Sequence, residues 1–236
     1  MIRHFGALIP STNTTVEIEY SRLLPTNLQV HIGRLGKANN IAFTPSRDED
    51  VAYQSKMLGT AKVEVLCLSQ TSASLFDEGY DAATVKRMTE GAGVPSLTSA
   101  EAVGRAVQAF GARRIALVSP YSEEVIGKAQ HYYESRYGLE VLATDPFGAT
   151  DSYAIGALSA DNATEAFARI DRPEIEVLVV PGGNFPTMKF IPQWEEQFGK
   201  PVITTNQAAL WAMMGVMKIK DPLPGLGRLL EQLPEG

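Results

Sequence analysis

The sequence predicts an α/β protein, and two observations carry that prediction. Short apolar runs, each expected to form a buried strand, alternate with longer stretches of helical periodicity along all 236 residues. Strict alternation of this kind is typical of parallel sheets that helices cover on both faces. The pattern also restarts near residue 114, which indicates two halves of similar build. We therefore expect two pseudo-symmetric, Rossmann-like lobes, each a four-stranded parallel sheet flanked by helices, with a cleft between them.

The first expected strand, residues 2–10, is an apolar run that ends in a turn of small polar residues. Residues 11–15 can cap a helix, because their side-chain oxygens accept hydrogen bonds from the free N–H groups of its first turn. Glu17 and Glu19 favour the same helix start through the helix dipole, and Pro25 ends the helix. The other strands of this half are expected at residues 28–33, 63–69 and 95–98, and its other helices at 48–61, around 85–90 and at 100–110.

The second half repeats the alternation of strand and helix. Its strands are expected at residues 114–119, 139–144, 177–180 and 201–204, and its helices at 123–136, 162–170, 188–198 and 207–217. Three pairs of segments link the halves: residues 95–107 with 201–213, VEVLCLSQTS with IEVLVVPGGN, and ALIP with ALVSP. They lie in the same order at offsets of 106 to 112 residues, which indicates an internal duplication. We place residues 1–108 and about 206–236 in the first lobe, and residues 109–205 in the second.

The composition favours a soluble globular protein, with 44% hydrophobic and 20% charged residues. A net charge of −6 argues against a nucleic-acid partner, which would favour a basic surface. Neither an apolar run of membrane-spanning length nor a secretory signal is evident, so we expect a cytoplasmic protein without membrane contact. The single cysteine and three widely spaced histidines show no metal-ligand spacing, so no metal site is expected.

The ends of four predicted strands carry neutral hydrogen-bond donors. Because ligands bind at the carboxyl ends of parallel strands, we expect these ends to line one active-site cleft. Hydroxyl groups, amides and glycine N–H groups suit a carboxylate or a developing oxyanion. The same residue types also serve as caps and turns, so the functional interpretation rests on four ends converging. The four ends are residues 11–14, 70–72, 120–121 and 182–184.

Four motifs distributed over the chain resemble those of one superfamily. PSTNTTVE at residues 10–17 is similar to P-S-S-N-T-T-x-E, and AKVEVL at 61–66 resembles the strand before a family cysteine. SPY at 119–121 matches the position of a family tyrosine, and GKPVITTNQAALWAMM at 199–214 resembles the C-terminal strand and helix. The chain thus resembles the aspartate/glutamate racemase superfamily, in the branch of maleate cis-trans isomerase and arylmalonate decarboxylase. The resemblance implies a two-lobed fold, no cofactor, and a homodimer or homotetramer.

The chain departs from this resemblance at the two cysteines that flank the substrate in the superfamily. The first is expected at position 70, where this chain has Gln70, and the second at 182 (or 183 if a gap is allowed), where it has Gly182. A second-lobe asparagine of the family falls near Ser152. The single thiol, Cys67, is expected to be an ordinary buried strand residue. Thiolate addition to a double bond and proton transfer between two thiols are therefore both excluded.

The resemblance leaves the anion-stabilising part of the site in place. The expected catalytic residues are Tyr121, Ser72, Thr71 and Gln70. The expected substrate-binding residues are Ser11, Asn13, Ser152, Gly182, Gly183 and Asn184. The proton would come from Tyr121, with a pKa near 10, from Ser72 or from water. Phe43, Tyr153, Phe185 and Phe190 are candidates for an apolar wall.

Three functions are open at this point. The first is a cofactor-independent lyase that resembles arylmalonate decarboxylase and acts on a small carboxylic or dicarboxylic acid through an enediolate-like intermediate. The second is a maleate-type cis-trans isomerase with a nucleophile other than cysteine, which the terminal motifs favour and Gln70 opposes. The third is a non-catalytic protein that binds a small dicarboxylate, since loss of both thiols is also what decay of catalysis would leave.

Overall fold

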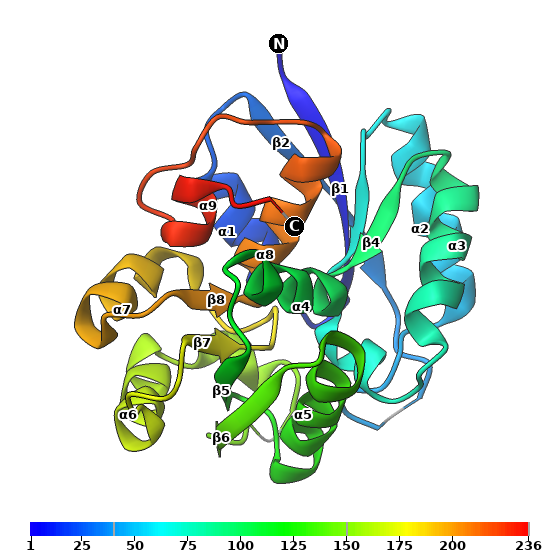
Figure 1. Cartoon of the computed structure of the whole chain (residues 1–236). Helices are drawn as coiled ribbons and strands as arrows, with labels where there is room; N and C mark the ends of the chain where they lie inside the picture. Colours follow the sequence, from blue (N-terminus) through cyan, green and yellow to red (C-terminus); the bar gives the residue numbers. More distant parts are fainter. Residues whose placement is uncertain (40, 150, 236) are drawn as a thin grey trace.

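The computed structural model describes residues 1–39, 41–149 and 151–235, and it confirms the predicted architecture. Two four-stranded parallel sheets have the strand orders β2-β1-β3-β4 and β6-β5-β7-β8. The second order is the first with every strand number raised by four, so the topology of the two sheets is the same. Helices flank both sheets, with α2 and α3 side by side on the outer side of the first one (Figure 1).

The described residues of the first half form four strands, four helices and one 3-10 helix. The strands are β1 (Arg3–Pro10), β2 (Leu28–Leu35), β3 (Leu66–Leu68) and β4 (Ser96–Thr98). The helices are α1 (Val16–Leu23), α2 (Asp48–Thr60), α3 (Tyr80–Ala92) and α4 (Ser99–Ala109), and the 3-10 helix is η1 (Thr71–Leu75).

The second half follows the same order and adds a short C-terminal helix. Its strands are β5 (Arg114–Ser119), β6 (Glu140–Pro146), β7 (Val177–Val180) and β8 (Val202–Thr204). Its helices are α5 (Glu123–Tyr137), α6 (Ala160–Ile170), α7 (Ile191–Phe198), α8 (Thr205–Val216) and α9 (Arg228–Gln232). Two 3-10 helices, η2 (Ala154–Ala157) and η3 (Met188–Phe190), complete this half.

Three predicted elements differ from the structure in extent. The helix expected around residues 85–90 spans Tyr80–Ala92. The strand expected at residues 63–69 is ladder-paired on both sides over Leu66–Leu68 alone, and beyond its end the chain passes into η1. The helix expected at 188–198 divides into η3 and α7. Pro192 lies in the first turn of α7, where a backbone N–H has no acceptor within the helix. The missing N–H of proline therefore costs no hydrogen bond there. The 3-10 helix η2 was not predicted.

Helices α4 and α8 pack against each other in the middle of the molecule (Figure 1). Each begins directly after the last strand of its own sheet. At the start of α4, Thr98 accepts a hydrogen bond from the N–H of Glu101, and at the start of α8 the side chain of Gln207 accepts the N–H of Thr204 at 3.5 Å. All ten residues from Thr205 to Met214 in α8 are buried, so this helix is part of the shared core. No helix in the described ranges is long and apolar enough to cross a membrane.

A buried carboxylate joins the two halves. Glu19 of α1 is 6% exposed, and its Oε1 accepts hydrogen bonds from the N–H groups of Thr187 (2.7 Å) and Met188 (2.8 Å). Its Oε2 accepts from the side-chain amide of Asn206 at 2.7 Å. Burial raises the pKa of this carboxyl above its ordinary value, partly offset by these hydrogen bonds. Glu19 thereby connects the first helix to the loop after β7 and to the start of α8.

The amino ends of the two sheets carry matching ion pairs. Arg3 at the start of β1 pairs with Glu64 just before β3, with Nη2 and Oε2 2.5 Å apart. Arg114 at the start of β5 pairs with Glu176 just before β7, with Nη2 and Oε1 2.9 Å apart. The two pairs occupy equivalent places in the repeated topology, which supports the predicted duplication.

Candidate active site

A small cavity of about 60 Å³ lies at the carboxyl ends of the strands of both halves. Pro10 closes β1, Ser69 follows β3, Tyr121 follows β5 and Gly182 follows β7, and all four line the cavity. The two sheets thus meet at one site, as the topology rule for parallel sheets predicts. Each of the four strand ends expected from the sequence contributes at least one lining residue.

Hydroxyl groups form a connected network at the base of the cavity. The hydroxyls of Thr71 and Ser99 are hydrogen-bonded at 3.0 Å, and Thr71 Oγ1 also lies 3.3 Å from Thr205 Oγ1. Thr205 Oγ1 in turn accepts the N–H of Gly182 at 2.9 Å. The network therefore runs from the end of β3 through the start of α8 to the end of β7. It fixes Thr71 beside Ser72, which is 7% exposed and also lines the cavity.

Tyr121 brings its hydroxyl to the same network from the second half. The residue is 3% exposed, and its hydroxyl interacts with those of Thr71 and Ser72. Burial raises the pKa of Tyr121 well above its ordinary value, while the neighbouring hydroxyls of Thr71 and Ser72 partly offset this. The expectation of a pKa near 10 is therefore wrong. The phenol stays protonated at any ordinary pH and serves better as a hydrogen-bond donor than as an acid.

The glycines after β7 shape the opposite wall. Gly182 has a φ of 129°, a backbone conformation that residues with a Cβ rarely adopt. A Cβ added at this position would lie 3.2 Å from Pro120 Cγ. Its N–H, expected to face an anion, instead donates to Thr205. Gly183 lines the cavity beside it, and its carbonyl accepts the side-chain amide of Asn206 at 3.0 Å. Of the Gly182 and Gly183 amides expected to bind an anion, that of Gly182 is already used within the protein.

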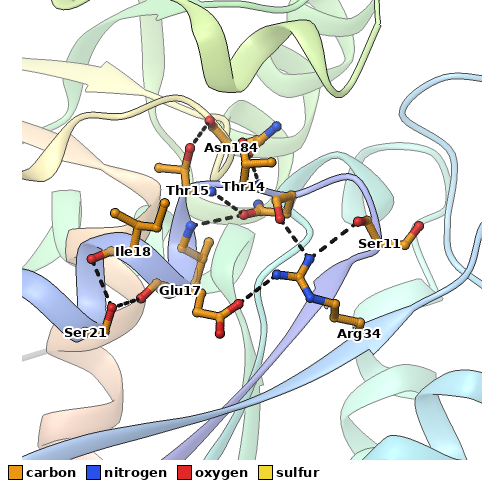
Figure 2. Close-up of polar contacts among 10 residues, drawn as sticks. Ser11, Thr14, Thr15, Glu17, Ile18, Ser21, Arg34 and Asn184 are labelled. Atoms are coloured by element: carbon orange, nitrogen blue, oxygen red, sulfur yellow. Dashed lines mark hydrogen bonds and ion pairs between the residues drawn. The ribbon is translucent and has the colours of Figure 1, made fainter.

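Asn184 connects the loop after β1 to the second half. Its Oδ1 accepts the N–H of Thr14 at 2.8 Å and its carbonyl accepts the Thr15 hydroxyl at 2.6 Å (Figure 2). Its Nδ2 donates to the Ser152 carbonyl at 2.6 Å. Asn184 and Ser152 both line the cavity. Asn184 therefore uses most of its hydrogen-bonding groups to connect the loops around the cavity.

The loop after β1 is itself held in place from two sides. Asn13, which lines the cavity, accepts the N–H groups of Thr15 and Val16 with its Oδ1, at 3.0 Å each. Asn13 thus accepts the free N–H of the first residue of α1, whereas the N-cap residue, Thr15, makes no side-chain capping bond. Arg34 donates to the carbonyls of Ser11 and Asn13 and pairs with Glu17 (Figure 2). Ser11 is exposed and is not among the lining residues, so the structure does not bring it to the cavity.

Gln70 lines the cavity, but its amide is bonded to the protein. Its Oε1 accepts the N–H and the hydroxyl of Ser46 at 3.3 and 2.8 Å, and its Nε2 donates to the Thr44 carbonyl at 2.9 Å. These contacts come from the loop between β2 and α2. The arrangement favours a positioning function for Gln70 over direct contact with a reacting atom.

The loop after β2 is the part of the site that the sequence reasoning largely missed. Its lining residues are Lys37, Ile41, Phe43, Thr44 and Ser46, of which Phe43 alone was a candidate, and Ile155 was missed as well. The signal was available, because β2 is also a parallel strand whose carboxyl end faces the cleft. Lys37 is the one charged side chain among the described lining residues, which favours an anionic ligand.

The apolar wall differs from the expected one. Phe43 does line the cavity, together with Ile41 and Ile155. Tyr153 is 65% exposed, Phe185 is fully buried against Phe147, and Phe190 packs on Trp194. The last three candidates were therefore wrong. Aromatic residues near a strand end cannot be assigned to core or cavity without the fold.

Cys67 lies inside β3 and is fully buried, as expected. Burial raises the pKa of its thiol to about 12, so it carries no thiolate near neutral pH. The described lining residues include no cysteine, histidine or carboxylate. Within the described ranges there is also no group of three or more histidine, cysteine or acidic residues that could hold a metal ion. The chemistry available to this cavity is therefore that of hydroxyls, amides and one ammonium group.

Comparison with known proteins shows the family of this chain. The model of the arylmalonate decarboxylase family matches residues 6–230, so the chain belongs to that family. The maleate isomerase of Pseudomonas putida is 27% identical over 245 residues, covering 95% of this chain and 96% of that protein. The arylmalonate decarboxylase of Bordetella bronchiseptica is 26% identical over 203 residues, covering 78% of each chain.

The solved structures agree with the observed fold. The maleate isomerase from Pseudomonas putida S16 superposes with a TM-score of 0.85 at 24% identity, covering 99% of this chain and 100% of that one. A glycine-to-cysteine mutant of arylmalonate decarboxylase in a sulfate-associated form gives a TM-score of 0.81 at 25% identity, covering 96% and 99%. The family and its relatives are enzymes, which supports an enzymatic function for this chain.

Proposed function

We propose that the protein is a cofactor-independent lyase that releases CO2 from a small dicarboxylic acid through an enediolate intermediate. The observation that carries the proposal is a cavity whose described lining has hydroxyl and amide donors and one ammonium group, but no thiol. Such a lining stabilises negative charge on oxygen and offers no sulfur nucleophile.

In the proposed reaction one carboxylate of the substrate is retained and the other leaves. The hydroxyls of Ser72 and Tyr121 hold the retained carboxylate, and Lys37 at the cavity edge attracts the dianion. The bond between the α-carbon and the departing carboxylate breaks, and its electron pair passes into the retained group to form the enediolate. A proton delivered from water or through Ser72 then reaches the α-carbon, and the products are CO2 and a monocarboxylate.

The apolar wall favours the breaking of that bond. Ile41, Phe43 and Ile155 offer no hydrogen bond to a carboxylate, so the charged departing group is poorly solvated there. Neutral CO2 carries no such penalty. Each donor aimed at the developing oxyanion contributes about 3 kcal/mol to lowering the barrier, so the hydroxyl pair of Tyr121 and Ser72 can account for a large acceleration.

The isomerase route is less well supported. The maleate cis-trans isomerase of Nocardia farcinica was solved with a covalently bound succinylcysteine intermediate. An equivalent adduct needs a thiolate in the cavity, and the one thiol of this chain is buried in β3 with its pKa raised to about 12.

A substrate panel tests the proposal. Malonic acids with hydrogen, methyl, phenyl and larger substituents are incubated with the purified protein, and CO2 and the monocarboxylate are quantified by carbon-13 NMR. We expect turnover of at least one member, and its loss in Tyr121→Phe. The same spectra, recorded with maleate, report any fumarate. An absence of turnover across the whole panel, or fumarate formation alone, would refute the lyase proposal.

A further inference from the structure

The side chain of Gln70 is occupied by protein contacts although it lines the cavity. Its Oε1 accepts two hydrogen bonds from Ser46 and its Nε2 donates one to the carbonyl of Thr44. An amide oxygen has two lone pairs, so Oε1 has no acceptor capacity left for a ligand. The residue is 8% exposed. Three of the four hydrogen bonds that the amide can make are therefore used within the protein.

The contacts of Gln70 hold what we term the roof segment, residues 41–46. Ile41, Phe43, Thr44 and Ser46 of this segment line the cavity. The ring of Phe43 packs edge-on against that of Tyr121, with centroids 5.4 Å apart and planes at 66°. Phe43 has a φ of 68°, a left-handed conformation that a residue with a side chain keeps only when its surroundings hold it. The position of the roof segment thus depends on Gln70 and Tyr121 together.

The base of the same loop is fixed independently of Gln70. Asp50 accepts the N–H of Gly36 at 2.6 Å, and the N–H of Arg47 donates to the Gly36 carbonyl at 3.1 Å. Arg47 also forms an ion pair with Asp50. Loss of the Gln70 contacts should therefore loosen the roof segment alone and leave the start of α2 intact.

We propose that Gln70 is a latch that holds the roof segment over the cavity and so limits the size of the acid that reaches Tyr121 and Ser72. It is a positioning residue and not a catalytic one. A cysteine at this position could not replace it, because the thiol is one weak donor on a short side chain and cannot bind Ser46 and Thr44 at once. The contact between Gln70 and the roof segment does not depend on the proposed lyase function, whereas the limit on substrate size rests on that function.

Amide hydrogen exchange on the ligand-free protein tests the latch. In Gln70→Leu, which keeps the side-chain bulk but removes all three hydrogen bonds, peptides covering residues 41–47 should exchange about tenfold faster than in wild type. Peptides from α4 and β5 should be unchanged. Gln108→Leu is the matched control, since Gln108 also donates to a backbone carbonyl, that of Tyr137, but far from the cavity. Unchanged exchange of residues 41–47 in Gln70→Leu would overturn the latch.

A second variant approaches the same contact from the roof. Ser46→Ala removes the 2.8 Å hydroxyl donor to Gln70 Oε1 and serves if Gln70→Leu does not fold. It should accelerate exchange in the same peptides by a smaller factor. In the double variant the two effects should not add, because both substitutions break one shared contact. Full additivity would show that Gln70 and Ser46 act separately and would count against the latch.

The size limit is measured with the malonic acid series described above. Gln70→Leu should raise kcat/KM for the largest accepted acid relative to the smallest by at least about fivefold, mainly through KM. Faster exchange without this shift would overturn the size limit. Wild-type inactivity on every acid would instead refute the lyase proposal, and the exchange result would still decide the latch.

Discussion

The amino ends of the two sheets are alike, whereas their carboxyl ends differ. Arg3 with Glu64 and Arg114 with Glu176 form the same ion pair at the same place in the two halves. At the other edge, β3 is followed by the polar side chains of residues 69–72, while β7 is followed by Pro181 and two glycines. The repeated end maintains the strand arrangement, and the differing end carries the site.

The difference assigns separate tasks to the two halves. The first half offers side chains to the cavity: Thr71 and Ser72 as hydroxyls, and Gln70 as the contact to the roof segment. The second half offers a backbone turn at Gly182, a φ of 129° that brings the chain close to Pro120. Tyr121 is its main chemical contribution. A duplicated fold can therefore hold one asymmetric site, because a sheet tolerates change at its carboxyl edge without loss of strand pairing.

The largest expected effect comes from removing the carboxylate that joins the two carboxyl ends. Glu19→Ala leaves the N–H groups of Thr187 and Met188 and the amide of Asn206 without their acceptor in a buried site. We expect a loss of about 3–5 kcal/mol of unfolding free energy, measured by urea denaturation. Glu17→Ala on the exposed side of α1 is the control and should cost less than about 1 kcal/mol. Equal effects of the two substitutions would contradict the bridging function of Glu19.

The next effect is on catalysis. Tyr121→Phe removes one donor from the oxyanion site while keeping the ring contact with Phe43, so we expect kcat to fall about 10²–10³-fold with little change in stability. Because burial raises the pKa of Tyr121, the wild-type rate should show no alkaline loss from this residue up to about pH 10. Tyr153→Phe, at a position 65% exposed, should leave kcat unchanged. An alkaline limb that disappears in Tyr121→Phe would contradict the assignment.

A smaller effect is expected at the backbone turn of the second half. Gly182→Ala forces a Cβ into a positive φ and to within 3.2 Å of Pro120 Cγ, so it should cost about 1–3 kcal/mol. Gly127→Ala provides the matched control, since Gly127 lies in α5 and an added Cβ would meet no other atom within 4 Å. This substitution should raise the unfolding free energy by about 0.5–1 kcal/mol. The two changes in unfolding free energy should have opposite signs. A cysteine at position 182 meets the same strain, so restoring thiol chemistry there requires the turn to move.

The smallest effect concerns the matching amino ends. The backbone N–H groups of Arg114 and Arg113 lower the pKa of Glu176 to about 2, and the Arg3 guanidinium lowers the pKa of Glu64. A carboxyl whose pKa is lowered in the folded state stabilises the fold at pH values above its pKa in the unfolded chain, which is ordinarily near 4.5. This stabilisation is lost as the pH falls toward the pKa of the folded state. Both side chains are over one-third exposed, so solvent screening keeps each contribution below about 1 kcal/mol.

The pH dependence of the unfolding free energy tests the contribution of these two carboxylates against that of other titrating groups. Glu176→Gln should flatten the fall in unfolding free energy between about pH 4.5 and pH 2, measured by urea titration at several pH values. Glu64→Gln should flatten the fall below about pH 4.5 in the same direction. A steep acid loss that persists in the double variant would show that other groups dominate it.

Elements whose structure depends on local sequence could be predicted. The strand Arg114–Ser119 and the end of α1 before Pro25 follow from local apolar runs and from proline chemistry. The strand ends were predicted to converge because parallel topology dictates it. The roof segment, apart from Phe43, was missed because residues 41–46 have no periodicity and are held by Gln70 and Tyr121, which lie far away in sequence.

The chemistry of individual site residues was harder to predict, because it depends on burial. The raised pKa of Tyr121 and the use of the Gly182 N–H by Thr205 both follow from contacts across the two halves. A sequence shows which donors are present, but the fold decides which of them are already used. Asn184 illustrates this, since its polar atoms hold the neighbouring loops.

The complete burial of Cys67 has a practical consequence. Its thiol, with a pKa raised to about 12, should remain unmodified by maleimide reagents in the folded protein. A cysteine introduced at Ile41, which is 66% exposed, would then be the sole reactive site on the native chain. A fluorophore or spin label attached there would report the position of the roof over the cavity in real time, without prior removal of any native residue.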